Sequence, residues 1–303
     1  MILVFAIIKM LKSISATTKI KPKNQPMSDT IQRNTRFSNK PLEERAHWYS
    51  TAAQAYDKAR ARYPYELISY IAELTQLSSA SRLLEIGCGP GIATTSFAEW
   101  GCSIVCVEPN PEFCELARNN CKPFPKVVIK QSSFEQWPIE TSTFDAVVSA
   151  SAFHWIQPEV GHPKVAEALR DDGYFILLWN KEPQPSPELW PSFTKIYNRQ
   201  DLSSLGRFET EAARQQALKT LVQPTIDSGL FKKVASQQVR MEKTYTAEDY
   251  LLLLSSFSPY ISLEESRRNN LFAVLKKQID DNLGGVINLS YISAADIFQK
   301  ITA

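Results

Sequence analysis

The sequence predicts an α/β protein built on a doubly wound, mostly parallel sheet. Three observations support this fold class. Short apolar runs, typical of strands covered on both faces, alternate with helical patterns between residues 82 and 180. The first run ends in a glycine-rich turn that leads into a helix. The second run ends in an acidic residue, Glu108, where the carboxyl ends of parallel strands would form a ligand site.

Composition restricts the class of protein. A chain of 303 residues can form one large domain or a domain with an insertion, and its apolar fraction of 44% is that of an ordinary folded protein. The net charge of +2 gives no specific nucleic-acid signal. The number of cysteines is odd, five, and most of them lie in predicted strands and helices, which favours reduced thiols and a cytoplasmic location. No Cys-x-x-Cys pair or nearby histidine completes a zinc site.

The N-terminal segment differs from the rest of the chain. Its first eight residues are apolar but too few to span a bilayer, so we expect no stable membrane insertion. Residues 1–26 contain five lysines and no acidic residue. We expect residues 1–44 to be a disordered tail, with either Met1 or Met27 as the start. The alternative is a weak interfacial membrane anchor.

Two helices are predicted before the first strand. Aromatic residues and alanines recur at helical spacing up to residue 59, and Pro64 suits the first turn of a second helix. Tyr56 and Tyr63 allow two interpretations, packing in the core or covering a ligand, because tyrosine can bury its ring and still offer a hydroxyl.

Residues 87–91, Gly-Cys-Gly-Pro-Gly, follow the first strand and precede the first helix of the sheet. Glycines let the backbone approach a ligand closely, and a helix start offers unpaired N–H groups. The turn therefore predicts a site for part of a nucleotide-like ligand. Its Gly-x-Gly-x-Gly spacing, preceded by Glu85, differs from the spacing of dinucleotide-binding turns.

The second strand, residues 103–108, places Glu108 where a carboxylate can accept hydrogen bonds from both ribose hydroxyls. A surface or capping acid is the alternative interpretation. A carboxylate here disfavours a cofactor with a 2′-phosphate.

The remaining strands are predicted at residues 126–130, 144–149, 174–179, 233–239 and 286–291. We expect Gly173 to turn the chain into the fifth strand with a positive φ. Residues 181–230 begin with a proline-rich loop and continue as polar helical sequence.

The chain resembles the class I S-adenosylmethionine (SAM)-dependent methyltransferases in three segments. The segment from Glu85 to Gly91 matches their acidic-x-Gly-x-Gly-x-Gly motif. The segment from Tyr56 to Pro64 is similar to a pattern that precedes this motif in small-molecule enzymes of the trans-aconitate and juvenile-hormone-acid type (methyltransferase type 11). Residues 149–155 match the signature S-x-x-A-x-H-W of that group.

This resemblance implies a Rossmann-like, seven-stranded sheet with an antiparallel strand 7, formed by residues 45–303, with a helical lid at about residues 181–230. It implies SAM as cofactor and a small-molecule acceptor with a carboxylate, hydroxyl or amine group. Ser133 takes the place of the adenine-reading aspartate, and His154 is either a general base or a residue that fixes its loop. The expected cofactor-binding residues are Tyr56, Arg60, Glu85, Gly87, Gly89, Gly91, Glu108, Ser133, Phe134 and Ser149.

Two other functions share these features. A nicotinamide (NAD)-dependent oxidoreductase would also have a strand, a glycine turn and a following acid, although the spacing speaks against it. A non-catalytic SAM-binding partner subunit is favoured by the loss of the adenine-reading acid at Ser133. The sequence predicts no oligomeric state.

Overall fold

The computed structural model describes residues 38–302. Most of the tail expected over residues 1–44 lies outside this range. Its last three residues belong to a helix, α3 (Leu42–His47), so the folded part begins earlier than the predicted domain boundary.

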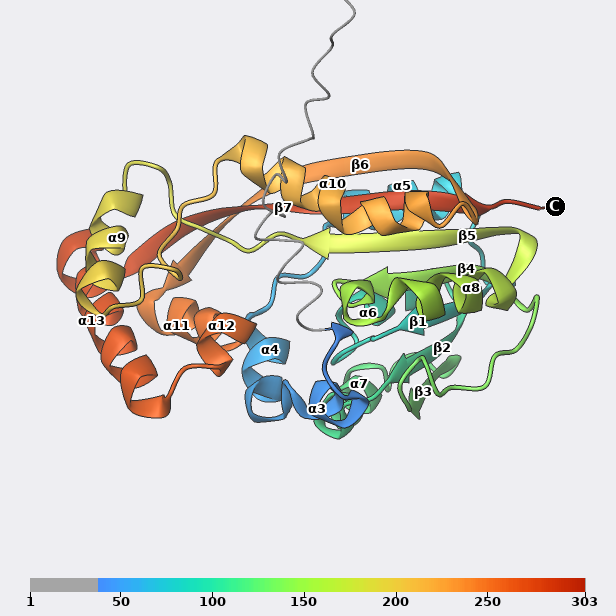
Figure 1. Cartoon of the computed structure of the whole chain (residues 1–303), viewed down its shortest axis with the longest axis horizontal. Coiled ribbons are helices and arrows are strands. Elements are labelled where there is room, and N and C mark those ends of the chain that lie inside the picture. Colours follow the sequence, from blue (N-terminus) through green and yellow to red (C-terminus); the bar gives the residue numbers. More distant parts are fainter. Residues whose placement is uncertain (1–37, 303) are drawn as a thin grey trace, which may run out of the picture.

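The strands form one seven-stranded sheet in the order β3-β2-β1-β4-β5-β7-β6 (Figure 1). β1 to β5 are parallel, and β7 is antiparallel to both of its neighbours. The predicted fold class is confirmed. The strands are β1 (Arg82–Ile86), β2 (Ser103–Glu108), β3 (Val127–Gln131), β4 (Phe144–Ala150), β5 (Leu169–Asn180), β6 (Phe231–Thr246) and β7 (Val286–Lys300).

Helices cover both faces of the sheet because the strands are apolar on both sides. One face packs against α5 (Tyr65–Leu74), α6 (Ile92–Ala98) and α7 (Pro111–Asn120), through side chains such as Leu67 and Phe97. The other face packs against α8 (Pro158–Ala168) and α10 (Glu211–Asp227), through side chains such as Val165 and Leu218.

The entry into β5 differs from the prediction. Gly173 lies inside the strand and is absent from the glycines with positive φ, so the expected left-handed turn is wrong. A Cβ on Gly173 would lie 2.9 Å from the Leu169 side chain and 3.0 Å from the Arg170 carbonyl oxygen. Lack of space, rather than backbone handedness, therefore accounts for this glycine.

The last two strands are much longer than predicted. β6 extends to residue 246 and β7 to residue 300. Only residues 293–299 of β7 pair with β5, whereas residues 286–292 pair with β6 and, at Ser290, form one isolated bridge to Gln184. The two strands thus continue beyond the sheet as a two-stranded ribbon.

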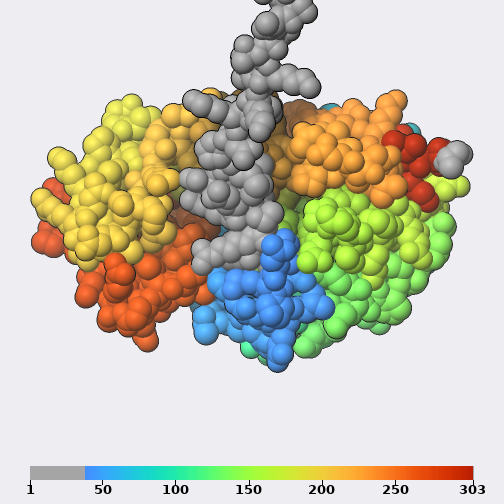
Figure 2. Space-filling view, in the orientation of Figure 1, coloured from blue at the N-terminus to red at the C-terminus, as the bar shows by residue number. Residues whose placement is uncertain are grey.

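This ribbon carries a group of helices that we call the cap. They gather at one end of the molecule, toward which β5 points (Figures 1 and 2). Buried side chains of the cap, including Phe193 and Leu271, form a core of their own with Tyr245 and Ile287 of the ribbon. The cap consists of α9 (Trp190–Arg199), α11 (Ala247–Ser255), α12 (Ser258–Ile261) and α13 (Glu265–Leu283).

The segment expected to be a lid, residues 181–230, is divided between two places. α9 belongs to the cap. α10 instead packs Leu218 and Val222 against the sheet beside Phe231. Most of the cap comes from the connection between β6 and β7.

Candidate cofactor-binding site

The glycine turn has the backbone that its sequence requires. Gly87, Gly89 and Gly91 have φ angles of 67°, 55° and 88°, in the left-handed region that glycine adopts most readily. A Cβ on Gly87 would lie 2.5 Å from that of Ala152, whereas a Cβ on Gly89 would meet no atom within 4 Å. The backbone at Gly89 therefore faces open space.

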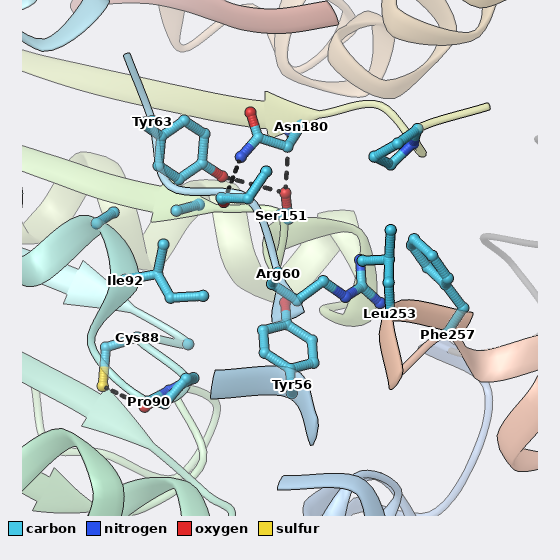
Figure 3. A pocket seen from close by; sticks show the side chains of 16 residues that line it. Tyr56, Arg60, Tyr63, Cys88, Pro90, Ile92, Ser151, Asn180, Leu253 and Phe257 are labelled. Carbon is cyan, nitrogen blue, oxygen red and sulfur yellow. Dashed lines mark hydrogen bonds between the residues drawn. The ribbon is translucent and has the colours of Figure 1, made fainter. Parts of the chain in front are cut away.

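Two adjoining cavities surround this turn, of about 50 Å³ (cavity 1) and about 110 Å³ (cavity 2). Figure 3 shows side chains around cavity 1, including those of Tyr56, Arg60, Tyr63 and Ile92. Aromatic side chains and the ends of β1, β2 and β4 surround cavity 2. The residues shared by both cavities are Tyr56, Gly87, Gly89, Ala150 and Ser151.

Glu108 connects the turn to the end of β2. Its Oε2 accepts a hydrogen bond of 2.9 Å from the Gly89 N–H, and its Oε1 accepts one of 2.9 Å from the Asn110 N–H. Burial raises the pKa of the carboxyl to about 7, against the effect of these two hydrogen bonds. Each oxygen keeps a lone pair, and Glu108 lines cavity 2, so the carboxylate can still accept from a ligand.

Glu85 lies beneath the turn and lines neither cavity. It is 1% exposed, and its Oε2 accepts a hydrogen bond of 2.6 Å from the Thr94 hydroxyl. Its Oε1 is buried without a hydrogen-bond partner among the described residues. Burial raises the pKa of this carboxyl to about 8.

Ser133 and Phe134 line cavity 2, on the side of β3. The Ser133 hydroxyl donates to Gln136 Oε1 at 3.1 Å and accepts from the Gln136 N–H at 3.3 Å. The Ser133 hydroxyl is therefore already engaged by Gln136. Phe113 and Tyr49 also line this cavity, with ring centroids 5.8 Å apart.

Two other predicted residues support the site from outside the cavities. Ser149 is fully buried, and its hydroxyl donates to the Ile86 carbonyl at 3.0 Å, joining β4 to β1. Gly91 is the N-cap of α6. Seven of the ten predicted cofactor-binding residues line a cavity, and Glu85, Gly91 and Ser149 do not.

His154 lies in a short 3₁₀ helix, η2 (Phe153–Trp155), and lines neither cavity. Its ring centroid is 5.5 Å from that of Trp179 and 5.9 Å from that of Trp155. Its Nδ1 is buried and has no hydrogen-bond partner in the part of the chain that the structure describes. Burial lowers its pKa to about 4, although the nearby Glu182 acts in the opposite direction, so the ring is neutral at pH 7.

Helix α3 contributes a wall of cavity 2 that the sequence did not predict. Leu42 and Arg45 line the cavity. Arg45 Nη2 donates to Glu135 Oε1 at 2.7 Å, and Nη1 donates to the Trp155 carbonyl oxygen. The helix is polar and follows a segment expected to be disordered, so no periodic pattern marked it.

The ends of β4 and β5 add two polar residues that the sequence analysis also missed. Ser151, with a φ of 55°, shares a hydrogen bond of 3.2 Å with the Tyr63 hydroxyl (Figure 3). Asn180 Nδ2 donates to the Ala61 carbonyl at 2.8 Å. Both line cavity 1, and their position at the carboxyl ends of strands is the signal that could have indicated them.

Other features of the described chain concern metal sites, membranes and thiols. Within residues 38–302, no three His, Cys, Asp or Glu side chains gather to hold a metal ion. No helix in the same range has the length and apolarity needed to cross a bilayer. The five cysteines are buried free thiols, as the prediction of reduced cysteines requires.

Comparison with known families places this site in context. The family described as "Methyltransferase domain" matches residues 84–177, which hold the glycine turn, Glu108 and His154. Over these residues the chain is similar to methyltransferases. The match covers the ends of β1, β2 and β4 but not the cap.

Curated relatives match different lengths of this chain. An uncharacterised methyltransferase of Mycobacterium tuberculosis is 34% identical over 132 residues, 44% of this chain and 51% of that protein. The chain thus spans about half the length of this curated relative. An uncharacterised methyltransferase-like protein of Schizosaccharomyces pombe is 26% identical over 228 residues, 75% of this chain and 84% of that protein.

Among solved structures, one described as a type II methyltransferase from Anaeromyxobacter dehalogenans has the same fold. It superimposes with a TM-score of 0.58 at 17% identity, over 80% of this chain and 99% of that one. At this identity the similarity concerns the fold alone.

Proposed function

We propose that the protein is a SAM-dependent methyltransferase that acts on a small molecule. One observation carries the proposal: two adjoining cavities meet at the open backbone of Gly89, with Glu108 beside it, inside a methyltransferase domain. The residues present also fit the cofactor. Glu85 Oε1 beneath the turn has no hydrogen-bond partner among the described residues, so it can accept, through water, from the ammonium group of a methionine moiety.

The chain divides the work of binding between the cavities. Glu108 would hold the ribose, and Ser133 and Phe134 would border the adenine in cavity 2. Tyr56, Arg60 and the glycine turn would hold the methionine part in cavity 1. SAM supplies an electrophilic methyl group on its sulfonium. The protein's contribution is to align the acceptor with that methyl group and to exclude water.

His154 has a limited role in this proposal. A pKa of about 4 makes its imidazole a weak base at neutral pH, because efficient general bases titrate near the working pH. This favours acceptors whose nucleophile is already unprotonated, such as a carboxylate. The residue then serves to hold the loop that follows β4.

A non-catalytic SAM-binding subunit is the second candidate, and Ser133 favours it. A serine hydroxyl replaces the charged acceptor of the resemblance and is already engaged by Gln136. Weak recognition of adenine would be compatible with a subunit that does not catalyse methyl transfer.

Calorimetry and activity profiling separate these functions. We expect SAM and S-adenosylhomocysteine to bind with micromolar or lower dissociation constants and NAD not to bind. Incubation with methyl-labelled SAM and a pool of small metabolites should transfer label to a small molecule. Binding without transfer would favour the partner subunit, and absence of SAM binding would refute both.

A further inference from the structure

Arg60 joins the cofactor site to the cap. It follows α4 (Ala53–Ala59), and its guanidinium lies 4.5 Å from the ring centroid of Tyr56 and 3.8 Å from that of Phe257, a residue of the cap (Figure 3). Arg60 is also the only charged residue among those that line cavity 1 in the described part of the chain. An anionic group of a ligand in this cavity would therefore be attracted to Arg60.

Ser256, directly after α11, fixes the orientation of this guanidinium. Its hydroxyl donates to the Leu253 carbonyl at 2.6 Å and accepts from Arg60 Nε at 2.8 Å. Its carbonyl oxygen accepts from Arg60 Nη2 at 2.7 Å. Two of the five guanidinium N–H groups are thus held by one buried residue, Ser256, while the same side chain lines cavity 1.

The cap contacts the cofactor site at other points as well. Leu253 and Phe257 line cavity 1 directly. The Tyr49 hydroxyl, from the wall of cavity 2, shares a hydrogen bond of 2.8 Å with the Ser258 hydroxyl of α12. The segment from Leu253 to Ser258 is therefore part of the wall of the site, although it is distant in sequence from the motifs that predict the site.

We propose that Ser256 is a positioning residue that holds Arg60 to bind the carboxylate of the cofactor's methionine part, so that the cap contributes to cofactor affinity. The inference rests on the proposed function. A pre-oriented guanidinium loses less conformational freedom on binding than a free one, and a carboxylate pairs well with its planar N–H groups. The cap, which lies outside the family match over residues 84–177, thereby belongs to the cofactor site.

The test compares two ligands. S-adenosylhomocysteine carries the methionine carboxylate, whereas 5′-methylthioadenosine keeps the adenosine and the thioether but lacks the amino-acid part. We expect Arg60→Ala to weaken S-adenosylhomocysteine by about 10- to 100-fold and Ser256→Ala by about 3- to 10-fold, as for loss of charge-assisted hydrogen bonds. Binding of 5′-methylthioadenosine should stay within about twofold in both variants.

Ser255→Ala is the matched control. The Ser255 hydroxyl makes the same type of bond, to the Leu252 carbonyl at 2.7 Å, but does not contact Arg60. It should leave both ligands unaffected. Arg60→Lys keeps the charge but loses the planar pair of N–H groups, and should weaken S-adenosylhomocysteine by an amount between those of Ser256→Ala and Arg60→Ala.

The outcomes separate this inference from the proposed function. Suppose that the unaltered protein binds S-adenosylhomocysteine more tightly than 5′-methylthioadenosine. If the variants then weaken the binding of both ligands equally, or of neither, Ser256 and Arg60 do not act on the carboxylate, and only this inference fails. If the unaltered protein binds neither ligand, the proposed function fails with it.

Discussion

The sheet and the cap hold their residues together in different ways. In the sheet, the residues around the cofactor site stand at the ends of β1, β2 and β4, where strand geometry brings distant residues to one edge. In the cap, α9, α11 and α13 are joined mainly by buried apolar side chains such as Phe193 and Leu275. Short local motifs therefore specify the site on the sheet, whereas the cap depends on burial and reaches the site through a few side chains, such as Phe257 and Ser256.

The first test of this difference between the sheet and the cap measures the free energy of unfolding. Phe193→Ala empties a fully buried position of the cap and should lower the free energy of unfolding by about 3–5 kcal/mol. Because β6 and β7 run through both regions, we expect a single transition in denaturant, measured by circular dichroism and tryptophan fluorescence. Phe97→Ala, at a buried position of the sheet region, is the matched control and should lose a similar amount. Two separate transitions would show that the cap folds independently.

A second test concerns the open backbone of the turn. Gly89→Val should weaken S-adenosylhomocysteine by about 100-fold or more, because the side chain would occupy space that the ligand needs. Gly229→Val is the control, since Gly229 also has a positive φ, of 67°, and no atom within 4 Å of its Cβ position, but lines neither cavity. Calorimetry and thermal melting of both variants separate backbone strain from occlusion. Equal binding by both would show that the turn does not face the ligand.

The third test removes the carboxylate at the end of β2. Glu108→Ala should weaken SAM by about 1–3 kcal/mol, through lost hydrogen bonds to the ribose and to the Gly89 N–H. Glu112→Ala removes a nearby exposed carboxylate that hydrogen-bonds Ser50, and should have no effect on binding. An unchanged dissociation constant in Glu108→Ala would remove this residue from the ribose site.

The smallest effect concerns pH. The folded protein holds the proton of Glu85 to about pH 8, whereas the unfolded chain releases it near pH 4.5. The free energy of unfolding therefore falls as pH rises between these values. Below about pH 6.5 the lowered pKa values of His154 and His162 act in the opposite direction, so the effect of Glu85 is best seen from pH 6.5 to 8. The melting temperature of the ligand-free protein should fall over this window, and less steeply in Glu85→Gln. An identical slope in that variant would contradict the buried, protonated carboxyl.

The sequence predicted the sheet and its motif residues because both depend on spacing along short segments. Glu108 follows the glycine turn at the distance that one helix and one strand require, and the structure joins it to the Gly89 N–H. The identity of Ser133 as an adenine reader stays a prediction, as do the roles of Tyr56 and His154.

What the sequence could not predict depends on contacts between distant residues. The second half of β7 contains Ala294, Ala295 and Asp296, which are poor strand formers, and it becomes a strand because it lies between β5 and β6. Ser256 is 196 residues from Arg60 and stands in no motif. Arg45 belongs to a polar helix, and its hydrogen bonds to Glu135 and to the Trp155 carbonyl attach this helix to the wall of cavity 2.

The position of β7 has a consequence for how the chain folds. This strand is the last in sequence but lies inside the sheet, between β5 and β6. Until it inserts, both neighbours present open edges that can pair with other chains, and such non-local pairing is slow. When β7 inserts, its first half also pairs with β6 and so forms the ribbon that carries the cap. Formation of the C-terminal strand should therefore be the step at which this protein is most exposed to aggregation, and ligands that bind only the completed site would protect the chain after that step.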